Sequence, residues 1–252
     1  MSQTETEVQT GHRVVPRQEW LAARRALLLE EKAHTRARDR LNAARRALPW
    51  TPVDKPYRFA TPHGPRGLGD LFEGRGQLAL YHFMLAPGWE AGCTGCSFLA
   101  DHFDGMLPHL NHHDVTLVAV SRAPLPEIEA YRRRMGWRFP WVSSFGSDFN
   151  RDFHVSFPPE ALAEGSVDYN YARLDAADAF EELHGMSAFG RTADGAVFHT
   201  YSTYARGVEE MMGTFMLMDR LPLGRNESGT MDWVRRHDEY ADEHGARSCC
   251  AG

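Results

Sequence analysis

Residues 76–103 read GQLALYHFMLAPGWEAGCTGCSFLADHF, and this stretch carries the strongest structural signal in the chain. It begins with a mostly apolar run of strand length at 76–85. It ends in a segment whose apolar residues recur at helical spacing from Cys96 onward. Between the two lies Cys93-Thr94-Gly95-Cys96. The sequence therefore predicts a C-x-x-C motif at the junction of a buried strand and an amphipathic helix.

The segments that follow alternate between strand and helix patterns. The helical pattern of 93–114 contains Pro108, which we expect to kink this helix late. VTLVAV at 115–120 is typical of a buried strand, residues 125–137 of an amphipathic helix, and FPWVSS at 139–144 of a short strand. This β-α-β-α-β order predicts an α/β fold.

The second half of the chain predicts three more elements. Residues 176–185, AADAFEELHG, favour a short helix that ends at the glycine. Residues 187–205 form two strand-like runs around Asp194-Gly195, a turn typical of β-hairpins. Residues 207–219 are expected to form a last helix, with Val208, Met212 and Phe215 on its apolar face.

Length and composition limit the class of protein. The chain has 252 residues, is 42% hydrophobic and 25% charged, and carries a net charge of −6, as an ordinary globular protein does. We expect a tail and helix at 1–50, one main domain at 51–225 and a polar tail at 226–252. No apolar run reaches membrane-spanning length, and the first residues do not resemble a secretory signal. The expected location is the cytoplasm.

The N-terminal helix is expected between Pro16 and Pro49, in a segment without glycine. Ten basic and four acidic residues give Arg13–Leu48 a charge of +6, although the whole chain is acidic. Such a helix can bind nucleic acid or a membrane. The more ordinary explanation is that the helix packs on an acidic body or on a second subunit and that its arginines form a solvated face. We therefore expect no nucleic acid or membrane partner, and a homodimer contact through this helix.

The C-x-x-C motif predicts thiol chemistry. At the start of a helix the unpaired backbone N–H groups stabilise a thiolate, so Cys93 is the expected nucleophile. Cys96 lies one turn further on and begins the apolar stripe. It is therefore expected to be shielded and to resolve the mixed disulfide that Cys93 forms with a partner.

Several neighbours are candidates for supporting roles. His82, in the preceding strand, is a candidate proton relay, although a core histidine with one hydrogen bond is the simpler explanation. Trp89 and Arg122, together with the two residues inside the motif, Thr94 and Gly95, are candidates for substrate binding.

The order of these elements from Tyr57 to Asp219 resembles the thioredoxin-like fold. The runs YHFMLAPGWEAGCTGCSFLADHF, VAVSRAPLPEIEAYRRRMGW and FPWVSSFGSDFNRDFHVSF are similar to a bacterial family of unknown function, domain family 899, and the resemblance covers most of residues 14–225. It implies a mixed sheet flanked by helices, with Cys93 and Cys96 where thioredoxin-like proteins carry redox cysteines. The sequence departs from the usual pattern in having no Trp directly before Cys93, no Pro within the motif and no Pro at 184–187.

Three alternatives remain open at the level of sequence. A peroxiredoxin-like peroxidase has a related fold, but Glu90 stands where its motif has a hydroxyl residue, three positions before the cysteine. Cys93, Cys96 and His102, with Cys249 and Cys250, are a conceivable zinc or Cu(I) set in a metal-binding protein. A non-enzymatic redox sensor would use the same reversible disulfide. Cys249 and Cys250 are either incidental thiols or a second dithiol that exchanges with Cys93.

The sequence thus favours a thiol–disulfide oxidoreductase over these alternatives. We expect a protein or small-molecule disulfide or thiol as its partner. We expect neither an organic cofactor nor a bound metal.

Overall fold

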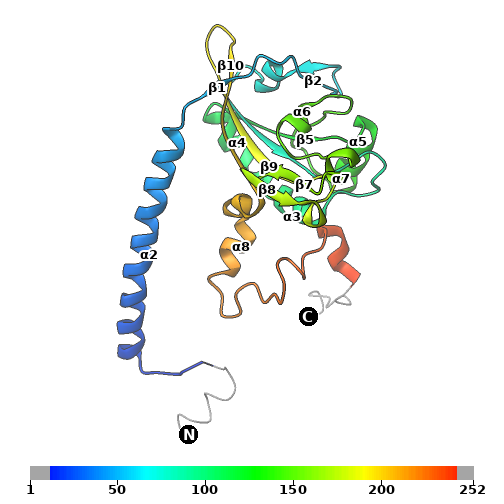
Figure 1. Ribbon diagram of the computed structural model, residues 1–252. Helices are drawn as coiled ribbons and strands as arrows, with labels where there is room; N and C mark the ends of the chain where they lie inside the picture. The colour runs from blue at the N-terminus through cyan, green and yellow to red at the C-terminus, as the bar shows by residue number, and fades with distance from the viewer. Residues whose placement is uncertain (1–11, 243–252) are drawn as a thin grey trace, which may run out of the picture. The chain divides into compact units, whose positions relative to one another are not determined.

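A six-stranded mixed sheet forms the centre of the main domain, in the order β1-β10-β9-β4-β5-β6 (Figure 1). β4 (Gln77–His82) runs parallel to β5 (Val115–Ser121) and antiparallel to β9 (Gly185–Arg191). β6 (Trp141–Ser143) pairs in parallel with β5, and β10 (Val197–Tyr204) forms the predicted hairpin with β9. The apolar run at 76–85 therefore supplies the central strand, which requires burial on both faces.

The computed structural model describes residues 12–242. The chain divides into two units at Pro49, and their described parts, 12–49 and 50–242, are considered separately. The first unit contains α2 (Arg17–Arg46), which begins after Pro16 and ends before Pro49 as predicted. Its Ala, Leu, Arg and Glu residues have high helix propensity, and no glycine interrupts them. No helix among the described residues is long and apolar enough to cross a bilayer.

The two faces of the sheet carry separate apolar clusters. Along β4, Leu78 and Leu80 lie in one cluster and Tyr81 in the other, as the two-residue period of a strand requires. The Tyr81 side is covered by α3 (Thr94–Ala100), α4 (Phe103–His112), α5 (Leu125–Arg134) and α8 (Gly213–Met218). The opposite side is covered by η1 (Leu68–Phe72) and α6 (Phe149–Asp152).

This topology confirms the predicted fold class, a thioredoxin-like mixed sheet flanked by helices, with an additional N-terminal helix. A strand, the C-x-x-C motif, a helix, a parallel strand, and a final hairpin and helix follow one another as the resemblance implied. The remaining short elements are β1 (Thr51–Pro52), β2 (Arg58–Phe59), β3 (Arg66–Gly67), α7 (Pro159–Ala163), β7 (Ser166–Tyr169), β8 (Ala172–Asp175), η2 (Ala176–Asp178), η3 (Ala205–Met211) and η4 (His237–Asp242).

The helix predicted over 93–114 is interrupted earlier than expected. α3 ends at Ala100 and α4 begins at Phe103, whereas Pro108 lies inside α4. The side chains at the interruption are held by distant partners: Asp101 accepts a hydrogen bond from the Trp137 indole, and His102 bonds Thr214. Tertiary contacts at 101–102, rather than the proline, thus set the position of the break.

The helix predicted at 176–185 is wrong. Only the 3-10 turn η2 forms there, and the chain then continues in an extended conformation to Glu182. Glu182 is buried, with 1% of its surface exposed, and it accepts hydrogen bonds from Ser156 (2.6 Å) and Arg122 (2.5 Å). These long-range partners override the local helix propensity.

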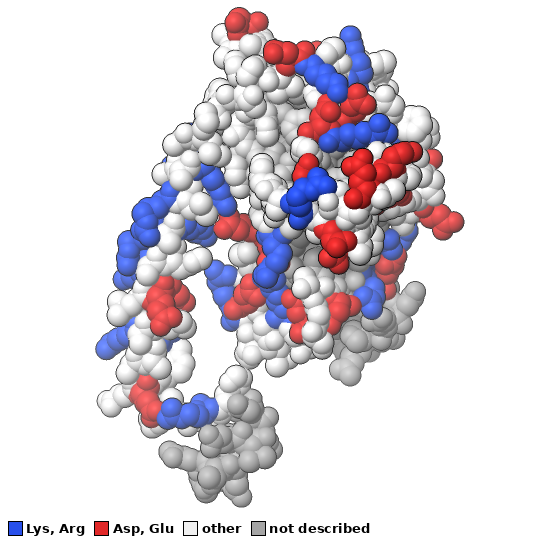
Figure 2. Space-filling view, viewed as in Figure 1, with Lys and Arg blue, Asp and Glu red and all other residues white. Residues whose placement is uncertain are grey.

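The last predicted helix forms in two parts, η3 and α8, and its apolar residues Val208, Met212 and Phe215 are buried as expected. On the face of the second unit seen in Figure 2, acidic and basic side chains lie interspersed. In the same view α2 carries mainly basic side chains, as its composition requires.

Candidate functional site

Cys93 lies at the end of the loop after β4, immediately before the first residue of α3. Its backbone N–H donates to the Met84 carbonyl (3.1 Å), and its own carbonyl accepts from the Ser97 N–H (2.9 Å) and hydroxyl (2.8 Å). The Ser97 hydroxyl also bonds the Tyr131 hydroxyl at 2.8 Å. These bonds fix the backbone at Cys93 against the segment that follows β4 and, through Ser97, against α5.

The residue before Cys93 has no room for a side chain. A Cβ at Gly92 would stand 2.8 Å from a ring carbon of Tyr131 and closer still to the ring of Phe83. Because Gly92 lies so close to these rings, the next residue, Cys93, packs against the apolar cluster on the Tyr81 side of the sheet. Cys93 is half-buried there.

Cys96 lies one helical turn further along and is almost fully buried, with 2% of its surface exposed. Burial raises the pKa of its thiol well above the ordinary value, and the nearby Cys93 sulfur adds to the effect. The Tyr81 phenol from β4 shares a hydrogen bond with this thiol. Cys96 therefore remains protonated while Cys93 ionises.

The pKa of Cys93 is lowered from 9.0 to about 6. The largest cause is the hydrogen bond that the Cys96 thiol donates to the Cys93 sulfur. The backbone N–H groups of Cys96 and Gly95 and the positive charge of Arg236 act in the same direction, whereas burial opposes them. At neutral pH Cys93 is therefore mostly a thiolate, the reactive form of cysteine.

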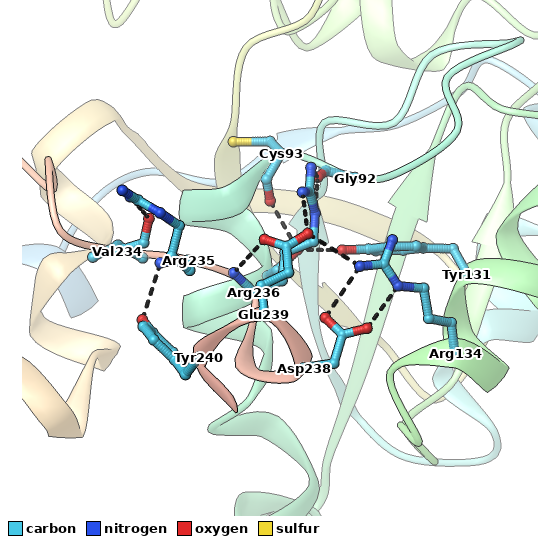
Figure 3. Close-up of polar contacts among 11 residues, drawn as sticks. Gly92, Cys93, Tyr131, Arg134, Val234, Arg235, Arg236, Asp238, Glu239 and Tyr240 are labelled. Carbon is cyan, nitrogen blue, oxygen red and sulfur yellow. Dashed lines mark hydrogen bonds and ion pairs between the residues drawn. The ribbon is translucent and has the colours of Figure 1, made fainter. Parts of the chain in front are cut away.

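Arg236 comes from a segment far away in the sequence, residues 227–240, which we call the C-terminal strap. Its guanidinium donates two hydrogen bonds, at 2.7 and 3.1 Å, to the carbonyl oxygen of Gly92 (Figure 3). A salt bridge to Glu239 at 2.8 Å holds the guanidinium in place. The strap thus brings a cation to the residue that precedes the nucleophile.

The strap is attached by apolar and ionic contacts. Val234 is buried within the cluster that contains Cys96, and Met231 and Trp233 pack against that cluster. Asp238 accepts two hydrogen bonds from Arg134 of α5, at 2.7 and 3.1 Å (Figure 3). The sequence predicts a polar tail from residue 226; its described part instead packs on the main domain.

The family described as "Bacterial protein of unknown function (DUF899)" matches residues 9–240, most of the chain. The chain belongs to this family. No curated protein matches the sequence significantly.

The chain is also similar to solved structures at low identity. A cysteine-to-serine variant of PrxQ from Xylella fastidiosa is 13% identical, with a TM-score of 0.45, and the match covers 67% of this chain and 94% of that one. Peroxidoxin BcpB from Mycobacterium tuberculosis is 14% identical, with a TM-score of 0.41, covering 68% and 97%. A putative protein disulfide isomerase from Bacteroides thetaiotaomicron is 15% identical, with a TM-score of 0.36, covering 68% and 92%. At these identities and TM-scores the likenesses do not bear on activity.

His82 of the DUF899 protein lies away from the cysteines. Its ring stacks on Phe149 and Phe153, on the face of the sheet opposite the one that contains Tyr81 and Cys96. Its Nε2 bonds the Ser187 hydroxyl at 2.8 Å, and burial lowers its pKa to about 3. This geometry gives the predicted proton relay no support and matches a core histidine.

Trp89 and Arg122, the predicted substrate-binding residues outside the motif, share a partner. The Trp89 indole donates to Glu181 at 2.9 Å, and Arg122 binds both Glu181 and the buried Glu182. Trp89 therefore ties the loop before Cys93, and Arg122 the end of β5, to the segment before β9. Thr94 and Gly95 begin α3 beside the Cys93 sulfur.

The metal set considered from the sequence is not assembled in the part of the chain that the structure describes. No cluster of three or more His, Cys, Asp or Glu residues suited to a metal occurs among residues 12–242. His102 bonds Thr214 and the carbonyl of Leu99. Cys249 and Cys250 lie outside the described residues.

The sequence reasoning missed Arg236 and Tyr81 as parts of the site. A signal for Tyr81 is present in the sequence: it precedes His82 in the predicted strand and therefore lies on the opposite face of the sheet. Arg236 had only a weak signal, the apolar residues Met231, Trp233 and Val234 in an otherwise polar stretch.

Proposed function

We propose that the protein is a thiol–disulfide oxidoreductase in which Cys93 is the nucleophile and Cys96 the resolving thiol. The observation that carries this proposal is the pairing of the two sulfurs. The buried Cys96 thiol donates a hydrogen bond to the half-buried Cys93 sulfur, so the pKa values of two neighbouring cysteines move in opposite directions. Such a separation is typical of an attacking and a resolving thiol.

The reaction proceeds in two exchange steps. The Cys93 thiolate attacks one sulfur of a substrate disulfide; a bond forms between Cys93 and that sulfur, and the other half of the substrate leaves as a thiolate. Cys96 then loses its proton to that thiolate or to solvent and attacks the Cys93 sulfur. The Cys93–Cys96 disulfide forms, and the second half of the substrate leaves.

The substrate is thereby reduced by two electrons and the protein dithiol is oxidised by two. A dithiol reductant returns the protein to its reduced form by the same exchange in reverse. The low pKa of Cys93 helps the forward attack at neutral pH. It also makes Cys93 a good leaving group when the protein disulfide is reduced.

Single serine substitutions separate the two roles. In a background with Cys249→Ser and Cys250→Ser, Cys93→Ser is expected to abolish turnover of a disulfide substrate with dithiothreitol as reductant. Cys96→Ser is expected to accumulate a mixed disulfide at Cys93, detected as added mass on the intact protein. Equal residual turnover in the two variants contradicts the assignment.

The same experiment addresses the peroxidase alternative. If hydrogen peroxide replaces the disulfide, an oxidoreductase of the proposed kind consumes it no faster than free dithiothreitol does. A peroxidase would consume it rapidly and would oxidise Cys93 to a sulfenic acid in Cys96→Ser. The ratio of the two rates decides between the alternatives.

A further inference from the structure

The C-terminal strap contacts the C-x-x-C motif on both sides of Cys93. On one side, Arg236 binds the carbonyl of Gly92. On the other, the thioether of Met231 lies over Gly95, with its methyl carbon 3.3 Å and its sulfur 3.5 Å from the position a Cβ there would take. The strap therefore occupies the surface around the nucleophile rather than a distant part of the domain.

The attachment of the strap is extensive. Val234 keeps only 3% of its surface exposed, and the Trp233 ring packs on Phe98 of α3 (5.9 Å between ring centres) and on Phe215 of α8 (6.3 Å). Beyond these apolar contacts, Asp238 forms the two-bond ion pair with Arg134. The strap is thus fixed to the domain by apolar contacts in its middle and by an ion pair near its C-terminal end.

From these contacts we infer that the strap limits the substrates of this site to low-molecular-weight disulfides and excludes disulfides held in folded proteins. The inference rests on the proposed function and adds its substrate class. A small disulfide needs access only to the Cys93 sulfur, and Cys93 as a residue is half-buried rather than buried. A disulfide in a folded protein brings polypeptide on both sides of its sulfurs, and that polypeptide must lie where Met231 and Arg236 stand.

Two variants loosen the strap without changing the cysteines. Val234→Ser removes the buried apolar anchor. Asp238→Lys replaces the ion pair with a repulsion toward Arg134 and, since Asp238 is exposed, does not disturb the core. The matched control is Arg235→Gln. Arg235 neighbours Arg236 but is exposed, and its guanidinium donates to carbonyl groups within the strap, those of Asp232 and Val234. Its backbone N–H, which the substitution keeps, donates to the Tyr240 hydroxyl (Figure 3).

The experiment measures the rate constant for Cys93 attack on oxidised glutathione and on insulin, with the reduced full-length protein. We expect the wild-type protein and Arg235→Gln to react with oxidised glutathione and to react with insulin at least tenfold more slowly. Val234→Ser and Asp238→Lys are expected to raise the insulin rate about tenfold and to leave the glutathione rate within about twofold.

Comparable wild-type rates on both probes, or an unchanged ratio in both loosened variants, would overturn the inference and leave the proposed function standing. No attack on either probe would overturn both. A second measurement compares the alkylation rates of Cys93 with a small and a large reagent, because alkylation needs no disulfide chemistry. At a pH well above the Cys93 pKa, where the thiol is ionised with or without the Arg236 charge, iodoacetamide should react at the same rate in all four proteins. A maleimide on a large polyethylene glycol should react faster in the two loosened ones, and equal rates with this large reagent would contradict the covering role.

Discussion

At the scale of single residues, the site depends on contacts that separate two chemically identical side chains. Cys93 receives hydrogen bonds at its sulfur and lies near a cation, while Cys96 is buried beside the Tyr81 phenol. A pKa difference of one unit corresponds to about 1.4 kcal/mol between protonation states. The surroundings, rather than the motif itself, thus assign the two roles.

Arg236 is a positioning residue whose loss should be visible in a pH profile. Because Cys93 is protonated below pH 6 and a thiolate above it, alkylation by iodoacetamide should rise to half its maximal rate near pH 6. Arg236→Gln removes the nearby positive charge, so we predict a midpoint shifted to higher pH. The control Arg235→Gln should keep the wild-type midpoint, and an unshifted Arg236→Gln profile would show that its charge does not act on Cys93.

Alanine substitutions at the two glycines near the nucleophile, Gly92 and Gly95, should differ in their effect on stability. Gly92→Ala forces a methyl group into the rings of Phe83 and Tyr131, and overpacking of this kind costs about 1–3 kcal/mol. Gly95→Ala meets only the flexible end of Met231 and should cost much less. Thermal unfolding should therefore separate the variants by about 2–4 °C per kcal/mol, with Gly92→Ala the lower.

At the scale of elements, the apolar runs predicted β4, β5 and β6 correctly because a buried strand must be apolar along its length. The hairpin of β9 and β10 was equally clear from its Asp194-Gly195 turn. The error at 176–185 has a different origin. Glu182 is drawn into the interior by Arg122, 60 residues earlier in the chain, and no local pattern encodes such a pairing.

Glu182 should therefore contribute more to the stability of the fold than its neighbour Glu181 does. Glu182→Ala leaves Arg122 and Ser156 without their buried partner, and we predict a loss of about 3 kcal/mol in the free energy of unfolding. Glu181→Ala removes a more exposed carboxylate and should cost less than about 1 kcal/mol. Denaturant titration of both variants measures the difference, and equal losses would refute the role given to Glu182.

At the scale of the whole molecule, the strap is the part of the site that sequence reasoning could not supply. Its residues 227–240 look polar because only Met231, Trp233 and Val234 give it apolar contacts with the domain. Its polar residues Arg236 and Asp238 bind Gly92 and Arg134, which lie more than 100 residues earlier. Local periodicity does not report contacts of that separation. The homodimer contact through α2 stays a prediction.

The proposed function requires Cys93 and Cys96 to form one reversible redox couple. The most direct test equilibrates the Cys249→Ser, Cys250→Ser protein in glutathione or dithiothreitol redox buffers, followed by alkylation and mass mapping. We predict a single two-electron transition between about −120 and −270 mV, in which both thiols become protected together. If the pair stays reduced throughout, or resists alkylation until a chelator is added, the dithiol is not a redox couple and the account is contradicted.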